Sequence, residues 1–261
     1  MQREGEGRVL LVGAGPGAAD LMTVRAIRAI ESADVVLHDA LIGEDVLALI
    51  PAGVKRIAVG KRGHRPSTPQ DFTNRLMARL ARSGQRVVRL KGGDPSIFGR
   101  SGEEREFLEA RGVAVEVVPG VTTASAAAAQ FGFSLTLREQ ARRAVFATGR
   151  TLEGCAGSWS LAADAQTTVC LYMGCADIAY ISGQLIAAGR SVGTPAIAAI
   201  DVERPSARLI QSTLGGLAEA LAGLEAAGPV FITIGEAAAQ ARNLATTEAV
   251  PLLRDLLANS R

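Results

Sequence analysis

Two glycines, an acid and a proline in a row, Gly92, Gly93, Asp94 and Pro95, are the residues whose types and spacing most directly suggest chemistry. They follow the strand-like run Arg86–Leu90, so a strand should end in this turn. Glycine lacks the Cβ atom that keeps a ligand away from the main chain, and Asp94 adds a carboxylate. The same residue types are common in ordinary turns, so the motif indicates either a ligand-binding loop or a plain strand end.

A second glycine-rich turn, Gly13–Ala18, follows the strand-like run Val9–Val12 and satisfies the loose dinucleotide pattern GxGxx[GA]. Asp39 lies about 20 residues further on, where a nicotinamide enzyme places its ribose-binding acid. Pro16 argues against that interpretation, because the dinucleotide turn leads straight into a helix and this loop continues to Thr23. An oxidoreductase remains an alternative.

The composition bounds the class of protein. With 261 residues, 48% of them hydrophobic, and a mean hydropathy of +0.21, the chain can fill one large or two medium domains. A formal net charge of +2 gives no overall field that favours nucleic acid or a membrane surface. The first residues are polar and no run approaches the roughly 18 apolar residues of a membrane span, so we expect a soluble cytoplasmic protein.

The cysteines and histidines argue against a metal site or a disulfide framework. Cys155, Cys170 and Cys175 are an odd number without metal-type spacing, and His38 and His64 are the only histidines. Arginine accounts for 25 of the 28 basic residues, a bias that suits carboxylate binding but also follows from a GC-rich genome.

Strand-like and helix-like periods alternate through the first half of the chain, which indicates a mostly parallel sheet covered by helices. In the second half, Arg208–Thr213 follows the strand-like run Ala196–Ile200 too closely for a helical crossover, so antiparallel pairing is expected there. We therefore predict two α/β domains, 1–120 and 121–261, the second with a mixed sheet. The polar stretch Arg150–Gln166 reads as a loop with one helical turn, and Glu248–Ala258 as a terminal helix.

Six motifs, taken together and in order, resemble those of the tetrapyrrole methylases, over roughly Arg8–Glu236. They are GAGPG, VVLHD, VGKRGHRPSTPQ, VVRLKGGDPSIFGRSGEE, VVPGVTTASAA and LYMG. The resemblance implies a homodimer of two α/β domains with S-adenosylmethionine in the cleft between them, and no metal. It also implies methylation of uroporphyrinogen III at C2 and then C7, giving precorrin-2, the branch compound for cobalamin and sirohaem.

The resemblance assigns roles to individual residues. Asp39 and Lys61 match the family's acid–base pair, and each ends a predicted strand, where an open α/β sheet presents its ligands. Met173 would pack on the adenine and Val202 would contact it through the backbone. The full set of cofactor residues is Pro16, Gly92, Gly93, Asp94, Ile97, Thr122, Thr123, Met173 and Val202. Three arginines, Arg62, Arg65 and Arg100, could hold substrate carboxylates by charge-assisted hydrogen bonds.

Each assignment has a structural alternative when it is taken singly. Met173 could fill a core, Thr122 cap a helix, Pro16 stiffen a loop and Lys61 end a strand in solvent.

Two segments depart from the family pattern: Ile200–Pro205 lacks the usual glycine, and Leu137 replaces the usual histidine. The second departure makes another corrin-ring methyltransferase an alternative, and an inert tetrapyrrole-binding protein is a third.

Overall fold

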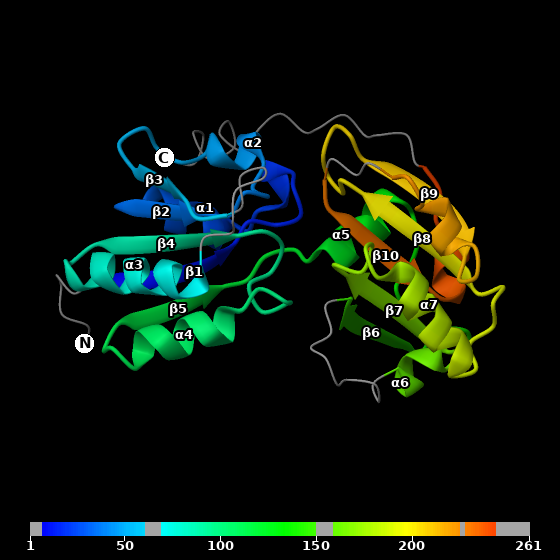
Figure 1. The fold of residues 1–261 in the computed structure, drawn as a ribbon. Helices are drawn as coiled ribbons and strands as arrows, with labels where there is room; N and C mark the ends of the chain where they lie inside the picture. The colour runs from blue at the N-terminus through cyan, green and yellow to red at the C-terminus, as the bar shows by residue number, and fades with distance from the viewer. Residues whose placement is uncertain (1–6, 61–68, 150–158, 225–227, 244–261) are drawn as a thin grey trace. The chain divides into compact units, whose positions relative to one another are not determined.

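The computed structural model describes residues 7–60, 69–149, 159–224 and 228–243. The chain divides into two compact units, with the division between Thr122 and Thr123. Each unit contains one five-stranded sheet (Figure 1). Across the described ranges, no helix combines the length and the apolar character needed to cross a membrane.

The sheet of the first unit is parallel throughout, in the order β3-β2-β4-β1-β5. Its strands are β1 (Arg8–Gly13), β2 (Val35–His38), β3 (Lys55–Ala58), β4 (Arg86–Lys91) and β5 (Ala114–Val118). Its helices are α1 (Val24–Glu31), α2 (Glu44–Leu47), α3 (Gln70–Arg82) and α4 (Ser101–Glu109), with a 3-10 turn at Ala19–Leu21.

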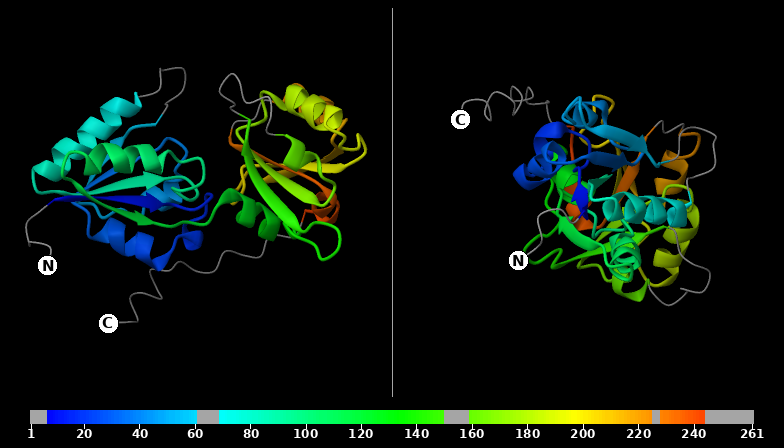
Figure 2. Two further views of the ribbon diagram at one scale, coloured as in Figure 1. Left: turned by 90° about the horizontal axis from the view of Figure 1, so that it is seen from below. Right: turned by 90° about the vertical axis from the view of Figure 1, so that its left-hand side faces the viewer.

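Helices cover both faces of this sheet, and the central strand β1 is accordingly apolar on both sides after Arg8. Leu10 and Val12 of β1 pack with α1 and α2, whereas Val9 and Leu11 pack with α3 and α4. In the left view of Figure 2 the blue α1 lies on one side of the sheet and the cyan α3 and green α4 on the other. Burying each such side chain contributes roughly 1.5–3 kcal/mol.

The connections after β1 and β4 leave the sheet in opposite directions. From β1 the chain crosses through α1 to β2, and from β4 it crosses through α4, on the other face, to β5. Because β1 and β4 are neighbours, the loops that follow them separate at a topological switch point. In open α/β sheets, ligands bind outside the carboxyl ends of the strands at such a point.

The helix ends agree in part with the sequence signals. Thr23 caps α1, since its hydroxyl accepts a hydrogen bond from the amide of Ala26 at 3.1 Å. At the start of α3, Pro69 occupies the N-cap position and gives no side-chain hydrogen bond.

The second unit has a mixed sheet, as expected, in the order β6-β7-β10-β8-β9. Only β6 and β7 are parallel, and the pairs formed by β7, β10, β8 and β9 are antiparallel. The strands are β6 (Arg143–Thr148), β7 (Thr167–Tyr172), β8 (Pro195–Ile200), β9 (Arg208–Thr213) and β10 (Val230–Ile234). The helices are α5 (Thr123–Gln130), α6 (Ser160–Ala163), α7 (Ile178–Ala187) and α8 (Leu217–Ala220), with a 3-10 helix at Glu236–Gln240.

One face of this sheet packs on α6, α7 and α8, with Val169 and Leu171 of β7 against Ile181 and Leu185 of α7. No side chain caps the start of α7, but its first residue, Ile178, packs into the core of the unit. Helix α6 supplies the single helical turn expected in the loop before β7, whereas residues 150–158 and the expected helix Glu248–Ala258 lie outside the described residues.

Candidate active site

The two glycine-rich turns predicted from the sequence lie side by side at the switch point. Gly15 and Gly93 form an antiparallel bridge, in which Gly15 N donates to Gly93 O at 3.2 Å and Gly93 N donates to Gly15 O at 2.7 Å. Both residues have a positive φ, +75° and +67°, which glycine adopts without strain. The loops after β1 and β4 are therefore joined by main-chain atoms.

A third loop, Pro119–Gly120 after β5, closes on the same point. A Cβ atom on Gly13 would lie 2.6 Å from Gly120 N, and one on Gly120 would lie 2.3 Å from Gly93 O. Side chains at these two positions would force the loops apart. We call residues 13–16, 92–94 and 119–120 the glycine cradle.

Gly92 differs from these packed glycines. It is exposed, and a Cβ atom built on it would meet nothing within 4 Å. Its main chain can therefore be approached closely by another molecule, which is the geometry needed if the cradle holds S-adenosylmethionine.

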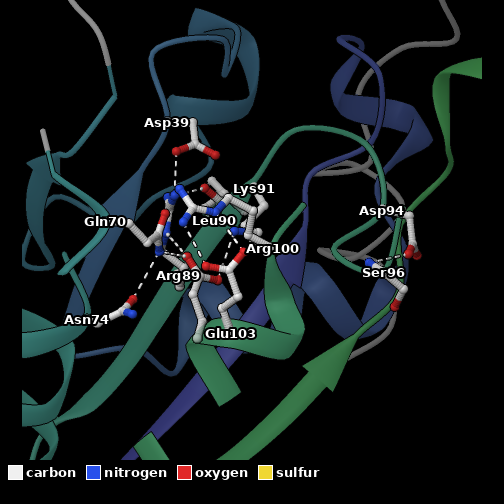
Figure 3. Close-up of polar contacts among 11 residues, drawn as sticks. Asp39, Gln70, Asn74, Arg89, Leu90, Lys91, Asp94, Ser96, Arg100 and Glu103 are labelled. Atoms are coloured by element: carbon white, nitrogen blue, oxygen red, sulfur yellow. Dashed lines mark hydrogen bonds and ion pairs between the residues drawn. The ribbon is translucent and has the colours of Figure 1, made fainter. Parts of the chain in front are cut away.

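Asp94 organises the cradle. Its Oδ2 accepts from Gly120 N at 2.9 Å and its Oδ1 accepts from Ser96 N at 2.7 Å, the second bond drawn in Figure 3. The amide of Ile97 donates to Asp94 O at 3.2 Å and closes the turn. Asp94 thus ties the loop after β4 to the loop after β5, and Pro16 follows Gly15 of the bridge directly in the chain.

Asp39 follows β2, next to β4, and its amide donates to Leu90 O at 3.4 Å. Its Oδ1 accepts from Nη2 of Arg89 at 2.5 Å, while 32% of its side chain is exposed (Figure 3). A partly accessible carboxylate held by a guanidinium at a strand end can exchange a proton with a bound molecule.

Behind Asp39 lies a buried charged cluster formed by Arg89, Lys91 and Glu104. The Glu104 side chain is 0% exposed and those of Arg89 and Lys91 are each 6% exposed. Arg89 Nε lies 3.3 Å from Glu104 Oε1, and Lys91 Nζ lies 2.8 Å from Glu104 Oε2. Buried ions are tolerated when they are paired and hydrogen-bonded in this way.

Two residues of α3 complete the cluster. Nε2 of Gln70 lies 3.0 Å from Glu104 Oε1 and 3.0 Å from Asn74 Oδ1 (Figure 3). Burial lowers the pKa of Lys91, nearby Arg89 lowers it further, and Glu104 raises it. The low-dielectric surroundings therefore disfavour the charged ammonium, although its partner Glu104 opposes this effect.

Arg100, an expected substrate contact, has an internal partner. It is exposed with a φ of +57°, and its Nε and Nη2 donate to the two carboxylate oxygens of Glu103 at 2.9 and 2.7 Å. The hydrogen bond that Arg100 donates to Glu103 raises the pKa of Arg100 and lowers the pKa of Glu103. To bind a substrate carboxylate, Arg100 must either release Glu103 or use the N–H groups that do not face Glu103.

In the second unit, Tyr172 connects two of the expected cofactor segments. Its hydroxyl oxygen accepts from the amide of Ala124 at 3.2 Å, at the start of α5 and next to Thr123. The next residue, Met173, has a φ of +52° and is 45% exposed. Its thioether is thus presented at the surface of the unit, which is unlike a core methionine.

Val202 lies in the turn after β8 with only 3% of its surface exposed. That burial suits the expected backbone contact better than a side-chain contact. The turn is tied to the end of α5, because Glu203 N donates to Oε1 of Gln130 at 3.0 Å.

The structure therefore gathers the expected residues in two places. Asp39 and the glycine cradle lie at the carboxyl edge of the first sheet, and Thr123, Met173 and Val202 lie around α5 in the second unit; Thr122 is the last residue of the first unit. Lys61, Arg62 and Arg65 lie outside the described residues.

Sequence reasoning did not single out Arg89, Lys91 or Glu104. The available signal was the pair of charges, Arg89 and Lys91, that follows the apolar Val87 and Val88 in the central strand β4, because parallel strands covered on both faces are normally apolar throughout.

Comparisons with known proteins agree with the motifs. Residues 8–218 match the family described as Tetrapyrrole (Corrin/Porphyrin) Methylases. The chain is 42% identical over 245 residues to the uroporphyrinogen-III C-methyltransferase of Paracoccus denitrificans, covering 93% of this chain and 85% of that protein. It is 45% identical to a siroheme synthase of Neisseria meningitidis over 90% of this chain, but spans only 48% of that longer protein.

Solved structures give the same result. The uroporphyrin-III C-methyl transferase of Thermus thermophilus, complexed with S-adenyl homocysteine, superposes with a TM-score of 0.74 at 39% identity, covering 88% of this chain and 98% of that one. A cobalt precorrin-4 methyltransferase superposes with a TM-score of 0.79 at 27% identity, covering 91% and 98%. This chain therefore belongs to the tetrapyrrole methylase family, as its six motifs indicated.

Proposed function

We propose that this enzyme transfers methyl groups from S-adenosylmethionine to carbon atoms C2 and then C7 of uroporphyrinogen III, giving precorrin-2. The observation that carries the proposal is the glycine cradle, where Gly92 leaves its main chain open at the switch point of the first sheet. The name of the Paracoccus relative supports the substrate, and the ligand named for the Thermus structure supports the donor.

Both units contribute cofactor residues in this proposal. In the first unit, Gly92, Gly93, Asp94 and Ile97 bind the methionine and ribose part, and Pro16 borders the site. In the second unit, Thr123 adds a polar contact next to Thr122, Met173 packs on the adenine and Val202 contacts it through the backbone. The exposed thioether of Met173 and the open space at Gly92 suit these roles.

S-adenosylmethionine supplies a sulfonium methyl group, which an electron-rich pyrrole carbon attacks as the carbon–sulfur bond breaks. The methylated ring is then a cation that must lose a proton. In this proposal Asp39 and Lys61 take part in that transfer, and arginines such as Arg62, Arg65 and Arg100 hold the carboxylates of the macrocycle. Alignment of two bound reactants can lower a barrier by about 7–11 kcal/mol, so this chemistry needs little else from the protein.

Methyl-labelled S-adenosylmethionine tests the proposal. Incubation with uroporphyrinogen III should release S-adenosylhomocysteine and place label at C2 and C7, which carbon NMR of the product distinguishes. Label at other carbons, or no transfer to this substrate, would overturn the proposal. Parallel incubations with a precorrin that is already methylated, and with nicotinamide cofactors, separate the alternatives.

A corrin-ring precorrin methyltransferase is the second candidate. Two observations favour it: the fold similarity to the cobalt precorrin-4 methyltransferase, and Leu137 in place of the family's histidine. Leu137 pairs with Ala141 in an isolated bridge and has no imidazole to offer a substrate. Faster transfer to the methylated precorrin than to uroporphyrinogen III would select this candidate.

We further propose that the two units are the domains expected from the sequence and that the enzyme is a homodimer. Sedimentation of the purified protein should then give twice the chain mass of 27.0 kDa.

A further inference from the structure

We propose that Arg89 is a positioning residue for Asp39, fixing the carboxylate so that it can exchange a proton with the substrate. The inference rests on the acid–base role proposed above for Asp39 and adds a residue to that machinery. Its basis is the buried cluster of Arg89, Lys91 and Glu104 behind the strand end.

The guanidinium of Arg89 is fixed on three sides. Its Nε donates to Glu104 Oε1 at 3.3 Å, its Nη1 to Leu90 O at 3.2 Å and its Nη2 to Asp39 Oδ1 at 2.5 Å. A planar group with three directed partners has one orientation, so the position of Nη2 is set before any substrate binds. Asp39 is the only one of these partners that contributes a partly exposed acidic group.

Glu104 holds the guanidinium from inside the unit. It is fully buried on α4, and its second oxygen accepts from Lys91 at 2.8 Å. Gln70 of α3 donates to the same oxygen of Glu104 that contacts Arg89. Two helices and the strand β4 therefore determine where Arg89 lies, and the two cations are balanced by Glu104 and Asp39.

Lysine could not replace arginine in this role. The single ammonium of a lysine cannot lie at the Nε position beside Glu104 and at the Nη2 position beside Asp39 at the same time. The substitution Arg89→Lys therefore keeps the positive charge and removes the rigid connection. It separates positioning from simple charge balance.

The test is a double-mutant cycle with Asp39. We expect Arg89→Lys to lower kcat by about 10–100-fold, since a displacement of about 1 Å at a reacting group has an effect of this size. The KM for uroporphyrinogen III and the calorimetric Kd for S-adenosylhomocysteine should change less than about threefold, because Arg89 acts only through Asp39. Asp39→Asn should lower kcat, and adding Arg89→Lys to it should lower kcat no further.

Arg86→Lys is the matched control. Arg86 lies on the same strand and faces Asp34 at 3.8 Å, but both side chains are nearly half exposed. It should leave kcat unchanged. If Arg89→Lys does not fold, the same cycle with Glu104→Gln decides, because that change removes the negative charge that holds Arg89 and keeps the shape of the side chain.

The outcomes are distinct. An additive loss in the double variant, or wild-type kcat in a folded Arg89→Lys, would overturn the positioning role and leave the acid–base role of Asp39 intact. Wild-type kcat in Asp39→Asn would instead remove the acid–base proposal on which this inference rests.

Discussion

At the scale of single residues, the glycines of the glycine cradle have different tasks. Gly13 and Gly120 are glycines because other main-chain atoms occupy the space of a side chain, and Gly93 because its φ is +67°. Gly92 has neither constraint, so the sequence signal for ligand binding is clearest at this position. A substitution at Gly92 therefore tests binding without testing the fold.

We predict that Gly92→Ala raises the Kd for S-adenosylhomocysteine at least tenfold, a loss of about 1.4 kcal/mol, because the new methyl group lies where the ligand approaches. Isothermal calorimetry measures the change, and circular dichroism should show an unchanged melting temperature. Gly53→Ala is the control, since Gly53 is also exposed with nothing within 4 Å of its Cβ position. Equal affinity in both variants would remove Gly92 from the site.

The cysteines give a pH-dependent prediction. Burial raises the pKa of Cys170 to about 12, and burial also raises the pKa of the less buried Cys175. At pH 8 roughly one Cys170 in 10,000 is then a reactive thiolate. Native protein treated with iodoacetamide should be alkylated at Cys175 before Cys170, as peptide mass spectrometry can show, and unfolding in guanidinium should remove the difference. Equal native rates would contradict the burial of Cys170.

At the scale of elements, Tyr172 joins the end of β7 to the start of α5. The first amides of a helix have no partner within the helix. The hydroxyl oxygen of Tyr172 therefore accepts a hydrogen bond from the amide of the buried Ala124, which would otherwise lack an acceptor. Its ring also packs edge-on against Phe146 and Phe231. A change that removes only the hydroxyl isolates the first contribution.

We predict that Tyr172→Phe lowers stability by about 1 kcal/mol, because the ring contacts remain while the amide of Ala124 loses its acceptor. The melting temperature should fall by roughly 2–4 °C. Tyr180→Phe, at a tyrosine of α7 that is 58% exposed, is the matched control and should melt like the parent protein. Identical melting of the two variants would show that the hydrogen bond adds no stability.

The sequence predicted some elements well and missed others, for physical reasons. The short connection between β8 and β9 excluded a crossover, and the two strands are indeed antiparallel. Helix α7 was not assigned, because IAYISGQLIA is apolar on most sides and periodicity cannot separate such a segment from a buried strand. The burial of Glu104 was not predicted, because its neighbour in the sequence is the exposed Glu103. Glu104 nevertheless shares a helix face with the buried Leu108, four residues on.

At the scale of the whole molecule, the fold class followed from the alternation of strand-like and helix-like periods and the family from the order of the motifs, whereas the contacts between motifs could not be predicted. The pairing of Gly15 with Gly93 depends on β4 lying beside β1, and strand order is not written in any local pattern. For the same reason the sequence indicated Asp39 but gave no sign that Arg89 holds it.

Ligand binding should be visible in the stability of the whole chain. If the enzyme binds S-adenosylhomocysteine, a concentration of 100 times Kd should stabilise it by about 2.7 kcal/mol and raise the melting temperature. NAD at the same concentration should give no shift, and Gly92→Ala, with a tenfold higher Kd, should reduce the stabilisation by S-adenosylhomocysteine to about 1.4 kcal/mol. A shift with NAD alone would favour an oxidoreductase.

The bridge between Gly15 and Gly93 uses amide and carbonyl groups alone. Mutation can alter the neighbouring side chains without removing those bonds, so selectivity for a particular macrocycle can diverge while the shape proposed to receive the methyl donor is inherited intact. A scaffold of this kind separates what evolution can change from what it must keep.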